Sequence, residues 1–446
     1  MRQERIIQAS IFDRFAEHEI GRELKAMSHW LDGQRELLSL VAADLRRGGA
    51  KETGRRGLPA EAVLRCALLK QYRQLSYAEL AFHLQDSASF RAFARLPLSW
   101  SPKRSVLHKT IGAIRTETWE RINRALLTSA RAAKLEPGTM VRFDSTAVAA
   151  LMHAPTDSSL LWDAVRVMVR LLKQASALPG VPMIRWRNHS RSAKQSARAI
   201  EYSRGRARKA ELYRKLLAAT HATLSSLRQV AQQMPPSQSN GGAAIWRTEV
   251  AHYLPLIERV IDQSERRILA GEAVSAGEKL VSLFEPHADI ILKGGRDVHY
   301  GHKLTLATGK SGLILDAVVE DGNRADSECF LPMLRRHVAF YGTPRQTATD
   351  GAYASLDNLN QAKAIGVRDV AFHKKRGLAI EDMVRSRWIY RKLRNFRAGI
   401  EAGISCLKRA YGLARCTWRG LDHFKAYVWS SVVAYNLALF ARLKPA

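Results

Sequence analysis

Three acidic residues stand at places in the sequence where a folded chain could gather them at one site. Asp144 lies in the apolar, β-branched stretch TMVRFDSTAVAAL, Asp350 ends the stretch RQTATD, and Glu401 lies inside the helical segment NFRAGIEAGISCLKRAYG. Carboxylate oxygens are the ligands that hard divalent cations prefer. Three such acids brought together would form a candidate site for metal-dependent chemistry, because their charges repel one another unless cations lie between them.

Each acid taken alone also has an ordinary structural explanation. Asp144 could cap the turn that follows it, and Asp350 forms a common turn dipeptide with the glycine after it. Glu401 could form an ion pair with Arg397, one helical turn earlier. The joint arrangement favours a shared site, because acids on the first strand, the fourth strand and the last helix of a mixed sheet would converge at one end of that sheet.

The order of the expected elements predicts an α/β fold with a mixed sheet of five strands and flanking helices. The first strand lies in residues 138–155, and the rest of this core lies in residues 283–446. There, the turn GKSG joins the strands DVHYGHKLTLAT and LILDAVVEDG into a hairpin, and RQTATDGAY and VRDVAFHKK supply two more strands. Helices are expected in SECFLPMLRRHVAFYG, in LDNLNQAKAIG and in the segment around Glu401, with a glycine ending the last two.

Two regions outside this core are predicted to be helical. Residues 1–137 are expected to form an all-helical DNA-binding region, with a helix-turn-helix-like module at about 58–127 in which Ser76 and Glu79 form a capping box. Residues 156–282 are expected to form a large helical insertion after the first strand. Its middle, residues 185–215, is strongly basic, which indicates either a solvated helical face or a surface that follows DNA phosphates.

Composition indicates a globular protein whose partner is a polyanion. The 446 residues are 46% hydrophobic and carry a net charge of +30. The four cysteines are far apart, which argues against a zinc ribbon and against a disulfide framework. The start of the chain lacks the apolar core of a signal peptide, and the apolar run 426–441 is shorter than the roughly 20 residues that span a bilayer. We expect a buried C-terminal helix, no membrane partner, and a cytoplasmic, nucleoid-associated protein.

The third acid lies in the most specific motif of the sequence. The chain from about residue 138 to its end resembles the RNase H-like catalytic domain of bacterial insertion-sequence DDE transposases, a group that carries the block Tyr-x2-Arg-x3-Glu-x6-Lys. Arg397, Glu401 and Lys408 fall at those spacings, and Arg394 occupies the tyrosine position. On an ideal helix the three matching residues lie within about 40° of one another, beside a separate apolar stripe.

The second acid lies in a block that matches the same group. Asp350 and Tyr353 fit its Asp-Gly-x-Tyr pattern, and Lys303 falls in YGHK, a weaker match to the second strand. The long blocks around these residues look most like the ISNCY type. By this resemblance Asp144, Asp350 and Glu401 would be the catalytic triad and would bind two Mg²⁺ ions, for which Mn²⁺ is expected to substitute.

The resemblance implies a transposase that binds the terminal inverted repeats of its insertion sequence and catalyses metal-dependent strand cleavage and strand transfer. Its partners would be double-stranded DNA, both transposon ends and target, and further copies of the chain in a homodimer or higher oligomer. Two alternatives stay open: another RNase H-like metal nuclease, such as a resolvase, and a domesticated DNA-binding regulator without catalysis. The residues expected to contact DNA are Arg397, Lys408, Lys303, Arg394, Trp418, Arg419, Lys103, Arg104 and Lys109. Trp418 could instead be a buried anchor.

Overall fold

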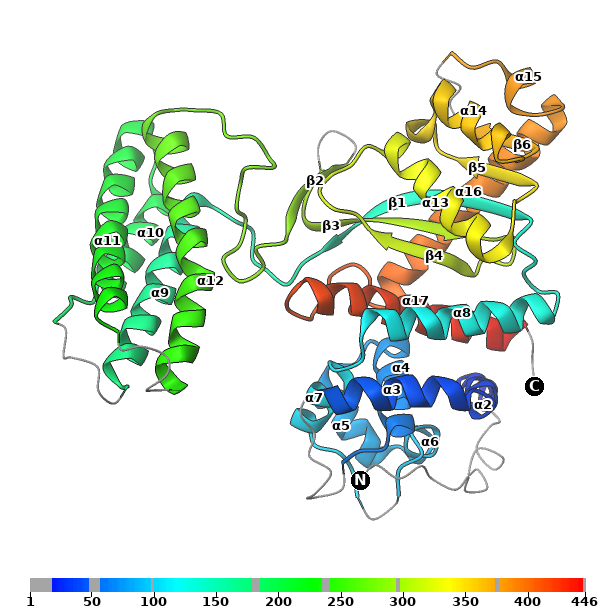
Figure 1. The fold of residues 1–446 in the computed structure, drawn as a ribbon, viewed down its shortest axis with the longest axis horizontal. Coiled ribbons are helices and arrows are strands. Elements are labelled where there is room, and N and C mark those ends of the chain that lie inside the picture. Colours follow the sequence, from blue (N-terminus) through cyan, green and yellow to red (C-terminus); the bar gives the residue numbers. More distant parts are fainter. Residues whose placement is uncertain are drawn as a thin grey trace. The chain divides into compact units, whose positions relative to one another are not determined.

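The computed structural model describes residues 18–47, 57–97, 100–178, 185–234, 241–293, 297–373 and 377–443. These residues form two compact units, both drawn in Figure 1. Unit 1 consists of the described residues from the start of the chain to Leu151 and from His302 to the end of the chain, together with Lys293. Unit 2 contains Met152–Leu292 and the described residues 297–301.

A mixed sheet of six strands carries Asp144, and Asp350 directly follows one of its strands. Its strands are β1 (Met140–Ala149), β2 (Asp289–Lys293), β3 (Asp297–Thr308), β4 (Ile314–Val319), β5 (Gln346–Thr349) and β6 (Asp369–Phe372). The order is β2-β3-β1-β5-β6, with β4 also paired to β3. Strands β1, β5 and β6 run parallel, and β4 runs antiparallel to β3.

The α/β class and the mixed sheet are confirmed, but the expected number of five strands is wrong. The additional strand is β2, whose sequence is DIILK. Such a short, continuously apolar run has no alternation to mark it as a strand, so periodicity alone does not separate it from a buried coil or a turn of helix. It becomes a strand because β3 is available beside it as a pairing partner.

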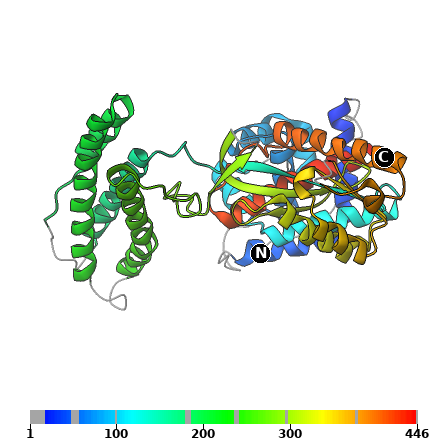
Figure 2. The same ribbon diagram turned by 90° about the horizontal axis from the view of Figure 1, so that it is seen from above.

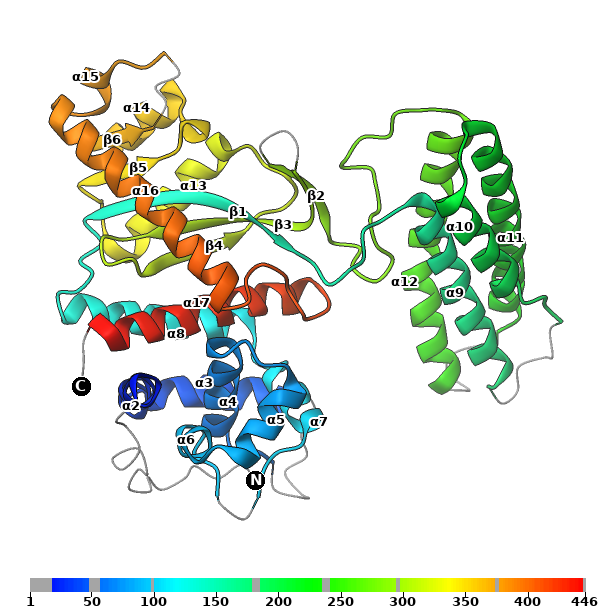
Figure 3. The ribbon, with the colours of Figure 1, turned by 180° about the vertical axis from the view of Figure 1, so that it is seen from behind.

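Helices cover both faces of the sheet in unit 1. Helix α13 (Asp326–Tyr341) packs against β1 and β4, and α16 (Arg387–Ala410) packs against β1, β5 and β6. Figures 1 and 3 show α13 and α16 on opposite faces. The shorter α14 (Leu356–Ala364) and α15 (Ile380–Met383) lie near β6, which both contact. Helix α16 begins well before the expected segment at residue 395, because Ser386 caps its first turn by accepting a hydrogen bond from the backbone N–H of Ile389.

The described residues before β1 are helical and contain no strand. The helices are α2 (Glu19–Asp32), α3 (Arg35–Arg47), α4 (Ala60–Tyr72), α5 (Tyr77–Asp86), α6 (Ala88–Phe93), α7 (Arg104–Ile111) and α8 (Thr116–Ala132). The capping box of Ser76 and Glu79 at the start of α5 is confirmed. These helices belong to unit 1, so the expected boundary near residue 137 lies inside a compact unit.

The last two helices of the N-terminal region are separated by a short break. Helix α7 ends at Ile111 and α8 begins at Thr116. A carboxylate oxygen of Asp44, on α3, accepts hydrogen bonds from the backbone N–H of Arg115 at 3.0 Å and from the hydroxyl of Thr118 at 2.6 Å. The cap that fixes the start of α8 therefore comes from another helix, which the local sequence does not reveal.

The apolar C-terminal run forms the buried helix α17 (Leu421–Leu443), as expected. It packs against α2, α4, α8 and β4, and with α8 it lies between the sheet and the other N-terminal helices (Figures 1 and 3). Its polar residues have partners. The Asn436 amide accepts a hydrogen bond from the backbone N–H of Ile314 and donates one to the carbonyl of the same residue, each at 2.8 Å. Among the described residues, no helix is long and apolar enough to cross a membrane.

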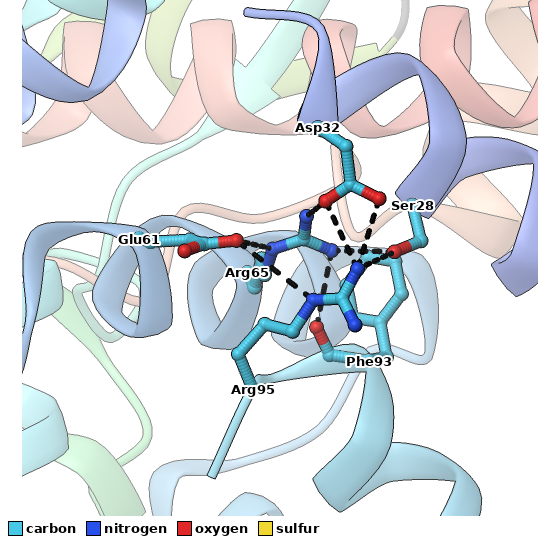
Figure 4. A network of polar contacts seen from close by, with 6 residues as sticks. All are labelled: Ser28, Asp32, Glu61, Arg65, Phe93 and Arg95. Atoms are coloured by element: carbon cyan, nitrogen blue, oxygen red, sulfur yellow. Dashed lines mark hydrogen bonds and ion pairs between the residues drawn. The ribbon is translucent and has the colours of Figure 1, made fainter. Parts of the chain in front are cut away.

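A buried arginine joins α2, α4 and the turn after α6 (Figure 4). The side chain of Arg65 is 1% exposed, and its guanidinium contacts Asp32 at 2.6 Å and Glu61 at 2.9 Å. Arg95 contacts the other carboxylate oxygen of Asp32 at 2.9 Å. Burying a guanidinium is costly unless it is fully paired, so this network fixes how the three elements pack.

A second buried cation in α4 forms no ion pair with a carboxylate of the described residues and predicts a pH-dependent stability. Lys70 is 5% exposed, its Nζ lies 4.9 Å from the ring centre of Tyr77, and burial lowers its pKa from 10.5 to about 8. Burial of the charged ammonium therefore lowers the free energy of unfolding by about 3 kcal/mol. The contact with the Tyr77 ring offsets roughly 1 kcal/mol of this loss. This cost is fully present below pH 8 and is relieved as pH rises toward 10.5.

We expect Lys70→Met to raise the free energy of unfolding by about 2 kcal/mol at pH 7 and by much less near pH 10. Urea unfolding at the two pH values measures the difference. The control is Lys109→Met, an exposed lysine on α7, for which the change should stay under about 0.5 kcal/mol. An advantage of Lys70→Met that did not shrink at high pH would contradict the assignment.

Unit 2 is a helical bundle with a core of its own. Helix α9 (Asp157–Ser176) packs against α10 (Ser190–Tyr202), α11 (Arg206–Gln233) and α12 (Gly241–Ser264), as Figures 1 and 2 show. A short π-helix (Glu265–Leu269) continues α12. Leu171, Leu216 and Val260 are among the fully buried core residues. Arg267 holds the first residue of α9, Asp157, through an ion pair of 2.7 Å.

Candidate active site

The parallel register of β1 and β5 places Asp144 beside Asp350. Phe143 lies opposite Thr349 in the ladder, so the residue that follows each of them in the chain is one of the two acids. Phe143 is fully buried, and because side chains alternate along a strand, Asp144 points to the other face of the sheet. Helix α16 packs on β1 and β5 and carries Glu401.

All three acids contact one guanidinium. The Nη2 atom of Arg397 lies 3.4 Å from Asp144 Oδ2 and 3.9 Å from Asp350 Oδ2. The Nη1 atom lies 2.7 Å from Glu401 Oε1. The arginine is one turn before Glu401 on α16, so the same helix supplies both an acid and the cation between the acids. The three carboxylates therefore converge on one positively charged point.

Asp144 and Asp350 each form a local hydrogen bond with the backbone and also take part in the shared site. Asp144 Oδ1 accepts a hydrogen bond from the Ser145 backbone N–H at 2.8 Å, and Asp350 Oδ1 accepts one from the Gly351 N–H at 2.7 Å. In both aspartates the other oxygen, Oδ2, is the one that approaches Arg397. The local hydrogen bonds thus fix each carboxylate while one of its oxygens stays turned toward the shared point.

The site is open to solvent on the side of Glu401. The side chain of Asp144 is 16% exposed, that of Asp350 is 39% exposed and that of Glu401 is 62% exposed. A large substrate can therefore approach the acids without entering a closed cavity. Among the described residues, no group of three or more histidine, cysteine, aspartate or glutamate side chains is close enough to hold a metal ion, and the guanidinium of Arg397 lies between the three acids of this site.

The side chain of Arg142, on β1, fixes α16 on the sheet. Its Nε donates to Thr308 Oγ1 at 2.7 Å, its Nη1 donates to the carbonyl of Phe396, and the guanidinium lies 4.6 Å from the ring centre of Phe396. A Cβ at Gly399 would stand 2.3 Å from Arg142 Nη1, so a larger residue there would displace the guanidinium of Arg142 from its contacts with α16. The sequence gives no local signal for this role, because both partners of Arg142 are remote in the chain.

A second polar cluster lies next to the acids and was missed by the sequence analysis. The hydroxyl of Ser145 donates to Asp326 Oδ1 at 2.8 Å, and Nζ of Lys303 lies 2.5 Å from the same oxygen. The buried ring of Tyr353 lies under this cluster, and burial, with the charges of Asp326 and Asp144, raises its pKa well above the usual value. An aspartate in the first turn of a helix is common, so Asp326 gave no signal in the sequence.

The residues expected to contact DNA fall into two groups. Arg394, Arg419, Lys103, Arg104 and Lys109 are exposed, and Lys408 and Arg397 are partly exposed. Lys303 and Trp418 are each 7% exposed. The ammonium of Lys303 also donates to the Arg324 carbonyl at 2.6 Å, and the ring of Trp418 lies 5.5 Å from that of Tyr427. In this arrangement Lys303 and Trp418 are internal, and for Trp418 the structure favours the buried anchor over base stacking.

Comparison with known families identifies two regions of the chain. Residues 286–437 match the family described as the transposase DDE domain, and residues 12–116 match a second transposase domain, DUF772. The first match includes Asp350, Arg397 and Glu401. Asp144 lies outside both matches, so its place in the site rests on the strand register and on its contact with Arg397.

Comparison with the curated proteins and with the solved structures gives no match for the chain. The two family matches lie on either side of β1 and unit 2, and both are with transposase domains. The two matches indicate a DDE transposase, and in the structure the acids Asp350 and Glu401 of the DDE match face one point, the guanidinium of Arg397.

Proposed function

We propose that this chain binds the terminal inverted repeats of its insertion sequence and catalyses metal-dependent DNA strand cleavage and strand transfer. The observation that carries the proposal is the convergence of Asp144, Asp350 and Glu401 on one cation at an open surface. The DDE transposase family is metal-dependent, and a set of three carboxylates suits a hard divalent ion. The ISNCY subtype remains a prediction.

Asp144, Asp350 and Glu401 are proposed to hold two Mg²⁺ ions, with Mn²⁺ as a substitute. When bound, such ions activate an attacking water or 3′-hydroxyl and stabilise the departing oxygen of the phosphodiester. The donor set fits because each aspartate already turns one oxygen toward a shared cationic point. Their other oxygens stay engaged by backbone N–H groups, which hold the carboxylates in place.

Arg397 has two roles in this proposal. Without metal, its guanidinium reduces the repulsion among the three acids. With metal ions held by the acids, the same guanidinium would be available to a DNA phosphate, for which its planar fork is well suited. Arg394 and Lys408 lie on the same helix, before and after Arg397, so DNA is proposed to run along α16.

The N-terminal helices are proposed to recognise the transposon ends. Arg104 and Lys109 on α7 and Lys103 just before it are exposed, and all three lie in the region matched by the second transposase domain. Pairing two ends requires at least two copies of the chain, so we propose a homodimer or higher oligomer on double-stranded transposon ends and target DNA.

The test is cleavage of DNA that carries the ends of the element, compared with DNA in which the same ends are shuffled. We expect nicks at the ends in Mg²⁺ or Mn²⁺, none in EDTA, and joining of the cut ends to a second duplex. Cleavage of branched DNA without end specificity would instead indicate a resolvase-like nuclease. End binding without cleavage in either metal would indicate a non-catalytic regulator. Both outcomes would overturn the proposal.

A further inference from the structure

Helix α10 of unit 2 carries a stripe of cations on one face. Arg191, Lys194 and Arg198 are all exposed, and Tyr202 at the end of the same face is 82% exposed. At 100° per residue these four side chains fall within about 80° of one another and extend along about 16 Å of helix. The buried residues of α10, Ala193 and Ile200, lie on the opposite face.

The surrounding sequence adds to this charge. Residues 185–215 contain eleven lysines and arginines but only two acids, Glu201 and Glu211, which gives a net charge of +9. Glu211 is engaged by Arg208 and Lys215, each at 2.8 Å. Glu201 is the one acid in the sequence of α10 and lies at the edge of the stripe.

Five further acids of unit 2 pair with cations outside the stripe. Glu249 contacts Arg170 at 3.3 Å and Glu258 contacts Arg228 at 2.7 Å. Asp262, Glu272 and Glu278 all contact Arg266. No ion pair is found between the three cations of the stripe and an acid of the described residues. A concentrated positive charge without internal compensation indicates an external anion.

We propose that this stripe, made of Arg191, Lys194, Arg198 and Tyr202, is a DNA-binding surface separate from the three acids, and that its partner is the phosphate backbone of duplex DNA. A length of about 16 Å corresponds to about five successive phosphates along one strand of the duplex. The exposed ring of Tyr202 provides an apolar contact for a sugar or an unpaired base at the end of the stripe. The inference rests on the proposed function only in taking DNA as the substrate.

The test is binding of the full chain to a fluorescent 30-base-pair duplex of random sequence, measured by anisotropy in EDTA over a range of salt concentrations. In the triple variant Arg191→Gln, Lys194→Gln, Arg198→Gln we expect affinity to fall about tenfold or more at 0.1 M salt, and the salt slope to fall by about 2 to 3. The control is the triple variant Arg170→Gln, Lys173→Gln, Arg228→Gln, which removes the same charge from α9 and α11 outside the stripe. It should change affinity less than about twofold.

An equal loss of affinity in both triple variants would show that only net charge matters and would overturn the inference, as would an unchanged salt slope in the stripe variant. Far-ultraviolet circular dichroism and thermal unfolding of both variants establish that each is folded. Cleavage of end DNA by the wild-type chain is measured separately in Mg²⁺. If cleavage fails while stripe-dependent binding persists, the proposed function is wrong and the binding surface stands. If cleavage occurs and the stripe variant binds normally, only the surface is wrong.

Discussion

Replacing Asp350 with asparagine is expected to reduce Mg²⁺-dependent cleavage of transposon-end DNA by about 1000-fold or more, equivalent to about 4 kcal/mol of transition-state stabilisation. The substitution removes a negative charge from the point where the three acids converge. Asparagine keeps an oxygen that can accept the hydrogen bond from the Gly351 N–H, so the turn after β5 should persist. Single-turnover cleavage measures the rate, and a mobility shift in EDTA should show nearly unchanged DNA binding.

The matched control for this prediction is Asp357→Asn. Asp357 is an exposed aspartate on α14, and its carboxylate accepts hydrogen bonds from Gln361 rather than facing Arg397. The loss of its negative charge in Asp357→Asn should leave the cleavage rate unchanged. Asp144→Asn and Glu401→Gln should each reduce cleavage as strongly as Asp350→Asn, because groups that act together in one site are not additive. If Asp350→Asn cut end DNA at the wild-type rate, the assigned active site would be wrong.

Replacing Arg397 with glutamine should have opposite effects on metal binding and on catalysis. In the free protein the guanidinium occupies the point that the three acids face, so it competes with a cation for their charge. We expect Arg397→Gln to bind Mn²⁺ about tenfold more tightly without DNA, which corresponds to about 1.4 kcal/mol. End cleavage at saturating metal should nevertheless fall by about 100-fold, because the phosphate contact of the guanidinium is lost.

Calorimetry or electron paramagnetic resonance of the protein titrated with Mn²⁺ measures the first effect, independently of activity. The matched control is Arg394→Gln, since Arg394 is an exposed arginine on the same helix and its guanidinium lies 6.0 Å from the ring centre of Tyr390. This control should leave Mn²⁺ affinity within about twofold of wild type. Weaker Mn²⁺ binding by Arg397→Gln would mean that the arginine supports the metal site instead of competing for it.

Local interactions explain what could be predicted from the sequence. The capping box of Ser76 and Glu79 and the glycines that end α14 and α16 depend on residues within about four positions of one another. The spacing of Arg397, Glu401 and Lys408 placed them on one side of a helix for the same reason. Asp350 and Glu401 were also identified through motifs whose residues are close in the chain.

Tertiary structure decided which of these residues meet and which are buried. Asp144 joins the site through the register of β1 on β5, although all of unit 2 separates the two strands in the sequence. The break before α8 depends on Asp44 of α3, and the position of α16 depends on Arg142 of β1. Strand registers and packing across elements are set by the whole fold, and no local pattern records them.

The three acids of the site show both contributions. The sequence alone determined their chemical type, and it placed each one in the correct strand, turn or helix. Only the folded chain decided that one oxygen of each aspartate is fixed by the backbone while the other faces Arg397. It also turned Lys303 inward to pair with Asp326 instead of leaving it for DNA. The physical reason is that an ion pair is selected by distance in space, and distances between remote residues are fixed only after the sheet and its helices have packed.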